Sequence, residues 1–132
     1  MKKKVIISII VFITIVVAAY LLMLINTNSV IREVRHAFML ELDVSDTIGR
    51  PIHKYNYMWV TDRGVDVGRV ELSLCRLLTL HNFKNGYIWV LYTYKAYDVD
   101  GKILTGSANI FSKWKIEKKE GAWEIVEIVE AP

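Results

Sequence analysis

The first 25 residues constrain this chain more than any other segment. Lys2, Lys3 and Lys4 precede 21 residues, from Val5 to Ile25, that carry no charged side chain. As a helix rising about 1.5 Å per residue, this run is about 30 Å long, the thickness of a bilayer's hydrocarbon core. Basic residues flanking a span stay in the cytoplasm. We therefore predict a cytoplasmic stub over residues 1–4, a transmembrane helix over 5–25 and an extracytoplasmic domain over 26–132.

A cleaved secretory signal is the alternative interpretation of this segment. The apolar region of such a signal is usually about 7–15 residues long and ends in a small-x-small cleavage site. The run here is longer, and its small pair, Ala18-Ala19, is followed by further apolar residues up to Ile25. These features favour an uncleaved signal anchor. We expect a single-pass protein of a bacterial cell membrane, with the lipid bilayer as its first partner.

The charge balance argues against a nucleic-acid partner. The chain has 17 Lys and Arg against 14 Asp and Glu. Without the three lysines of the stub, 14 residues of each sign remain. A domain that binds DNA or RNA would carry a basic excess in its folded part, so we expect no nucleic acid among the partners.

Cysteine and histidine usage excludes several kinds of site. The chain has a single cysteine, Cys75, so it cannot form an internal disulfide, and the surrounding apolar run predicts a buried thiol. The three histidines, His36, His53 and His81, lack the spacing of a metal site, and no glycine-rich phosphate motif is present. We therefore expect neither a metal nor a cofactor.

The exported part begins with helical periodicity and ends with strand patterns. Apolar residues recur at helical spacing over 30–42, with Asn28 or Ser29 as the expected cap, unless the membrane helix runs on without a break. Residues 43–54 are expected to form a loop, and 55–61 a strand. Four further strands, the first of which could also be read as a helix, are predicted at 70–81, 87–97, 102–116 and 123–129.

Turn signals separate these predicted strands. Asn85-Gly86, Asp100-Gly101 and Glu120-Gly121 each favour the positive φ angles of a tight hairpin. One helix followed by such a meander can bury its apolar face by packing into the concave side of a curled sheet. The predicted fold class is therefore α+β, with one helix on a curved sheet of four to five antiparallel strands.

The closing third of the chain resembles a known superfamily. The segments 87–92 (YIWVLY), 98–101 (DVDG), 113–118 (KWKIEK) and 121–128 (GAWEIVEI) look like the final strands of small exported nuclear transport factor 2-like domains. That superfamily usually places two or three helices before the sheet, so a reduced, cystatin-like roll is the alternative. Over residues 87–130 the resemblance implies a roll with a pocket and no fixed chemistry, because such folds host both enzymes and binding modules.

Candidate catalytic groups follow from what a roll enzyme needs. A general base must be buried enough for its pKa to approach neutrality. His53 and Glu71 are the candidates that we carry forward, while Asp43 and Asp46 fit an ordinary solvated loop.

Arg76 and the tyrosines of the longest predicted strand are candidates for binding. Simple alternation puts Arg76 on one face with Val70, Leu72, Leu74, Leu78 and Leu80. It could face inward and bind an anionic group, or a bulge or its long stem could bring its charge to solvent. Tyr92 and Tyr94 could belong to a binding face or to the core, since strands favour aromatic residues in either place.

These observations lead to one main functional hypothesis and two rivals. The main hypothesis is a membrane-anchored, non-enzymatic module that binds or assembles with a second copy, through the open sheet face, or with another protein of the cell envelope. One rival is a roll enzyme of isomerase or hydrolase type. The other is an accessory subunit of a conjugation or secretion machine, because such subunits also pair an N-terminal helix with a roll.

Overall fold

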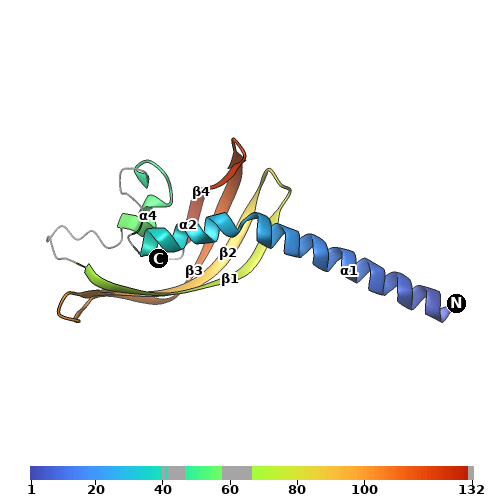
Figure 1. Ribbon diagram of the computed structural model, residues 1–132, viewed down its shortest axis with the longest axis horizontal. Coiled ribbons are helices and arrows are strands. Elements are labelled where there is room, and N and C mark those ends of the chain that lie inside the picture. The colour runs from blue at the N-terminus through green and yellow to red at the C-terminus, as the bar shows by residue number, and fades with distance from the viewer. Residues whose placement is uncertain (40, 42–46, 58–66, 131–132) are drawn as a thin grey trace.

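The protein is an α+β molecule in which a long apolar helix leads into a domain built on a four-stranded antiparallel sheet (Figure 1). The computed structural model describes residues 1–39, 41, 47–57 and 67–130. The apolar helix projects away from the domain, so that the N-terminus lies at the far end of the molecule (Figure 1).

The apolar helix and the amphipathic helix are almost continuous. Helix α1 spans Lys2–Asn26, helix α2 spans Asn28–Phe38, and Thr27 alone separates them. The two follow one another nearly in line (Figure 1). The structure is therefore close to the alternative prediction, in which the membrane helix continues without a break into the next helix. The expected cap is wrong, because Asn28 and Ser29 are already helical and Thr27 holds the cap position.

The predicted meander is confirmed. Its strands pair in chain order, with every neighbouring pair antiparallel. The turns at Asp100-Gly101 and Glu120-Gly121 lie where the signals placed them, with positive φ at both glycines and at Glu120. The strands are β1 (Val67–His81), β2 (Asn85–Asp98), β3 (Ile103–Lys119) and β4 (Ala122–Glu130).

The first hairpin turn lies earlier than predicted. Asn85 and Gly86 belong to β2, and the turn is formed by residues 82–84. The Asn82 side-chain oxygen accepts hydrogen bonds from the backbone N–H groups of Lys84 and Asn85, at 3.0 and 2.9 Å. An asparagine can thereby organise a turn by itself. Gly86 serves a different purpose, since a Cβ there would lie 2.2 Å from a β1 carbonyl oxygen.

The predicted strand at 55–61 is wrong over its described part. Residues 55–57 belong to a short helix, α4, which spans His53–Tyr57. Turns closed by Arg50, His53 and Lys54 N–H groups lead into it, and Pro51 fits the start of such a helical segment. Aromatic content favours a strand only weakly against this local turn chemistry. Residues 58–61, like Asp43 and Asp46, lie outside the described residues.

The core lies between α2 and the concave face of the sheet. Figure 1 shows the sheet curving around α2, which bears four buried residues, Val30, Val34, Ala37 and Phe38. Phe38 stacks on Tyr55 of α4 with ring centroids 4.6 Å apart, and it lies 5.2 Å from the ring of Tyr92. An aromatic cluster therefore fills the concave side and fastens both helices to the sheet.

A β-bulge at Leu77 changes which side chains of β1 face the core. Arg76 pairs with Val90 while Leu78 pairs with Trp89, so Leu77 is the extra residue. The predicted alternation is therefore wrong beyond Arg76, because a bulge shifts the side-chain pattern by one residue. Leu78 is 39% exposed, whereas its neighbour Thr79 is fully buried. Before the bulge, Cys75 faces outward and is exposed, so the predicted buried thiol is also wrong.

Candidate functional site

The junction between α1 and α2 is held by Arg76 of β1. One guanidinium nitrogen donates to the Leu24 carbonyl oxygen at 3.0 Å and to Thr27 Oγ1 at 3.3 Å. The other donates to Asn28 Oδ1 at 2.8 Å. Arg76 thus faces inward, but its described partners are the last turn of α1 and the first residue of α2 rather than an acidic group.

Three more residues hold the same end of α1. The Thr79 backbone N–H donates to the Tyr20 hydroxyl at 3.2 Å, and His81 Nε2 lies 3.2 Å from the Met23 carbonyl oxygen. Trp123 Nε1 of β4 donates to Asn26 Oδ1 at 2.6 Å. We call Arg76, Thr79, His81 and Trp123 the helix clamp. It joins β1 and β4 to the last two turns of the apolar helix.

The electrostatics of the helix clamp suit a helix C-terminus. The last carbonyl groups of a helix carry partial negative charge, and those of Met23 and Leu24 accept from Thr27 as well as from the helix clamp. Arg76 supplies a positive charge there, and burial lowers the pKa of its guanidinium below the ordinary value. His81 Nδ1 accepts from the Phe83 N–H at 3.0 Å, which leaves Nε2 as the donor to Met23.

A second polar cluster is centred on Glu130 at the end of β4. Glu130 Oε1 accepts from the Tyr55 hydroxyl at 2.6 Å and from the Tyr92 hydroxyl at 2.7 Å. Glu130 Oε2 accepts from Lys54 Nζ at 2.7 Å. Trp114 Nε1 in turn donates to the Tyr55 oxygen at 2.8 Å. The cluster ties α4 to three strands.

The protonation states of this cluster favour structure over acid–base chemistry. Burial raises the pKa of the Glu130 carboxyl, but the hydrogen bonds from Lys54, Tyr55 and Tyr92 outweigh it and leave that pKa below its ordinary value. Burial, with the hydrogen bond to Glu130, raises the pKa of both Tyr55 and Tyr92 well above the usual range. At neutral pH, Glu130 is therefore an ionised acceptor and the tyrosines are neutral donors.

The structure does not bring the sequence-predicted catalytic candidates together. His53 begins α4, and its Nδ1 lies 2.8 Å from Thr47 Oγ1. Glu71 is exposed on β1, where it accepts from the Tyr97 hydroxyl at 3.2 Å and pairs with Arg69 at 3.3 Å. Arg76 lies on the opposite face of β1 from Glu71, in the helix clamp.

The candidate binding tyrosines lie in the core. Tyr92 is 1% exposed and Tyr94 is 7% exposed, and their rings stack on each other with centroids 6.0 Å apart. The outer face of β2 carries Tyr87 and Trp89 instead, whose ring centroids are 5.7 Å apart. Aromatic residues of one strand thus divide between the core and the outer face.

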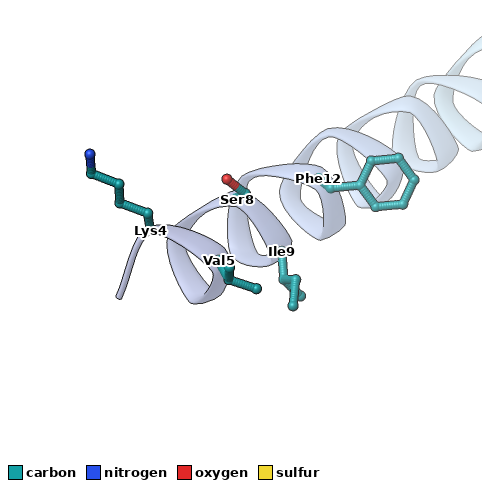
Figure 2. A pocket seen from close by; sticks show the side chains of 5 residues that line it. All are labelled: Lys4, Val5, Ser8, Ile9 and Phe12. Carbon is teal, nitrogen blue, oxygen red and sulfur yellow. The ribbon is translucent and has the colours of Figure 1, made fainter. Parts of the chain in front are cut away.

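The hollows among the described residues are shallow. One of about 380 Å³ lies on the side of α1 and is lined by residues a helical turn apart, from Lys4 to Phe12 (Figure 2). Another, of about 260 Å³, lies on β1 and β2 beside Glu71 and Lys95. Neither brings ionisable groups together around an enclosed space.

Comparison with protein-family models, with curated proteins and with solved structures finds no match to this chain. The structure alone therefore defines the class of protein: an α+β domain whose sheet is hydrogen-bonded to the end of the apolar helix that precedes it. Among the described residues that helix is the one long and apolar enough to cross a bilayer, which makes it a candidate membrane anchor.

Sequence reasoning missed both polar clusters. Trp123 and Glu130 lie 97 and 75 residues from the Asn26 and Tyr55 partners that they bind. The available signal was the presence of Arg76 and His81 in a segment, residues 74–81, that is otherwise mostly apolar. Such polar side chains require partners when they are buried.

Proposed function

We propose that this chain is a single-pass membrane protein whose extracytoplasmic domain acts by binding or assembly and is held rigidly at the bilayer by its own anchor. The helix clamp is the observation that carries the proposal. A tethered domain would need only a loose linker, but here a single non-helical residue, Thr27, separates α1 from α2. The sheet also binds the last two turns of α1.

The surface of α1 supports the membrane part of this proposal. None of its 25 residues is buried, and its middle presents only apolar side chains apart from Ser8 and Thr14. The Thr14 hydroxyl donates to the Ile10 carbonyl oxygen at 2.8 Å, so its polar group is satisfied within the helix. In water this surface would be costly, whereas in lipid it is the expected surface of a span.

The packing of the concave face favours binding over catalysis. Phe38, Tyr55 and Tyr92 fill the concave side of the sheet, where a roll enzyme would place its substrate. The described groups with shifted pKa values are Arg76 and members of the Glu130 cluster, and each is held by several hydrogen bonds. We also propose that the domain is related to nuclear transport factor 2-like or cystatin-like rolls, as residues 87–130 suggest. Such a fold is compatible with a binding module.

The native cysteine gives a direct test of topology. Cys75 is exposed on the outer face of β1. Intact cells that express the full chain would be treated with a membrane-impermeant maleimide, and the same reaction would be run after permeabilisation. We expect labelling of Cys75 in intact cells, and retention of the chain in membranes washed with alkaline carbonate.

A matched variant reports the other side of the membrane. In a Cys75→Ser chain, a cysteine placed by Lys2→Cys should react only after permeabilisation. Labelling of that site in intact cells, or protection of Cys75 until the cells are opened, would reverse the proposed orientation. Release of the chain by carbonate would show that α1 is not a membrane span.

A further inference from the structure

We infer that the end of β1 and the hairpin that follows it insert into the outer leaflet of the bilayer beside α1; this rests on the proposed membrane anchoring. Four large apolar side chains are exposed there. We call them the lipid patch: Leu77, Leu78, Leu80 and Phe83, which are 48%, 39%, 47% and 47% exposed.

The helix clamp sets the depth of the lipid patch. The Thr79 N–H is 3.2 Å from the Tyr20 hydroxyl, and His81 Nε2 is 3.2 Å from the Met23 carbonyl oxygen. If the span ends at Ile25, Tyr20 lies about 8 Å inside that end at about 1.5 Å per residue. Leu78 and Leu80 flank Thr79 in the chain and therefore lie at a similar depth. Apolar groups of interfacial proteins enter a bilayer to about 5–10 Å.

The Leu77 bulge determines which side chains at the end of β1 face outward and which face inward. Beyond it, Thr79 and His81 face the concave side, where they meet α1, and Leu78 and Leu80 face the outer side. Their cross-strand partners on the outer side are Trp89 and Tyr87. Tryptophan and tyrosine are enriched where proteins meet the polar boundary of a membrane. One backbone irregularity thus places Thr79 and His81 beside α1 and, next to them, an apolar surface on the outer side.

The charges at this end of the sheet point to apolar insertion rather than attraction to anionic lipid. The Lys118 N–H donates to the Lys84 carbonyl oxygen at 2.8 Å, which joins the β1–β2 hairpin to the neighbouring strand. Lys84, Lys118 and Lys119 exceed Glu117 and Glu120 by only one positive charge. We therefore expect insertion to depend little on the anionic content of the membrane.

The opposite end of the sheet provides an internal control. Figure 1 shows the β2–β3 turn at the opposite end of the molecule from the N-terminus. Val99 in that turn is 73% exposed, so it too is an apolar side chain in water. In the part of the chain that the structure describes, the hydrogen bonds from the sheet to α1 come from the helix clamp beside the lipid patch, at the other end of the sheet from Val99. Exposure alone therefore does not mark a residue for insertion, and Val99 serves as the matched control position.

Depth-dependent quenching tests the inference on the full chain. In a Cys75→Ser background, single cysteines at Leu80→Cys, Phe83→Cys and Val99→Cys would carry an environment-sensitive fluorophore, and Phe12→Cys would report on α1. The chains would be placed in phosphatidylcholine vesicles, with and without phosphatidylglycerol. Quenching would be measured with a lipid that carries a shallow nitroxide, with a lipid that carries a deep nitroxide for Phe12→Cys near the bilayer centre, and separately with aqueous iodide.

We expect nitroxide quenching at Leu80→Cys and Phe83→Cys to exceed that at Val99→Cys severalfold in both lipid mixtures, with the reverse order for iodide. Equal behaviour at the three positions, with Phe12→Cys still quenched by lipid, would overturn the insertion and leave the anchor intact. Protection from both quenchers would overturn it in favour of a second copy covering the patch. Loss of nitroxide quenching at Phe12→Cys would overturn the proposed anchoring itself.

Discussion

Replacing Arg76 by methionine removes the charged head of the helix clamp while keeping a long apolar stem. Three hydrogen bonds are lost, to Leu24 O, Thr27 Oγ1 and Asn28 Oδ1. A buried hydrogen bond from a charged donor contributes about 1.5–3 kcal/mol. Asn28 Oδ1 can recover water because its bond is exposed, Leu24 O keeps its hydrogen bonds from Thr27, and the bond to Thr27 Oγ1 is long. We therefore expect the free energy of unfolding to fall by about 2 kcal/mol in total.

The assay should separate this local effect from general destabilisation. We would follow urea unfolding of the full chain in lipid nanodiscs by tryptophan fluorescence and amide hydrogen exchange over residues 24–31. Arg69→Met is the matched control, because Arg69 lies on the same strand with its side chain 63% exposed. We expect that variant to lose less than about 1 kcal/mol.

The reasoning about the helix clamp would be refuted by either of two results. The first is a loss of unfolding free energy in Arg76→Met no greater than in Arg69→Met. The second is unchanged hydrogen exchange at the junction between α1 and α2. Faster exchange confined to residues 24–31 would show that Arg76 holds the two helices together.

Three further predictions concern stability, measured by urea unfolding. Glu130→Gln should cost about 2 kcal/mol at neutral pH because three donors lose an ionised acceptor. Since the folded-state pKa of Glu130 lies below the ordinary 4.5, this stabilisation is full above that value. It is lost as pH falls through the folded pKa, so the gap between variant and parent should narrow in acid. Thr79→Val should raise the free energy of unfolding by about 1 kcal/mol. Among the described residues, Thr79 Oγ1 is the one buried polar side-chain atom without a hydrogen-bond partner. Gly86→Ala should cost more than about 2 kcal/mol, since its Cβ would meet the Leu80 carbonyl oxygen at 2.2 Å.

Controls make each of these outcomes decisive. Lys54→Ala removes only the more exposed donor to Glu130 and should cost less than Glu130→Gln. Gly121→Ala meets no atom within 4 Å and should show only the penalty for positive φ, about 1 kcal/mol. A pH-independent gap for Glu130→Gln, a destabilised Thr79→Val or a tolerated Gly86→Ala would each contradict the packing described here.

Much of the fold could be predicted from local signals. The long uncharged run predicted an apolar helix, because length and composition alone decide whether a segment can form a helix that crosses a bilayer. Period-two patterns and Gly-containing turns predicted the β2, β3 and β4 strands and two of the three hairpin turns. Where local signals competed, the prediction failed. Aromatic content at Tyr55 favoured a strand, but the turns around Pro51 start a helix.

Neither polar cluster could be predicted, because both depend on long-range geometry. The bulge at Leu77 leaves no composition signal, yet it decides that Thr79 and His81 face inward and that Leu78 and Leu80 face outward. Arg76 could be placed on the inner face by alternation, but its partners lie about 50 residues away in α1 and α2.

The amino-acid sequence by itself determined an apolar helix of membrane length, the strand order of a meander and the neutrality of the attached domain. These depend on composition and on periods of a few residues, which are legible along the chain. Only the tertiary structure determined that the domain is hydrogen-bonded to the last turns of that helix and that an apolar surface is exposed beside it. The reason is physical: a buried donor finds its acceptor through space, and one extra residue in a strand reverses every side chain that follows.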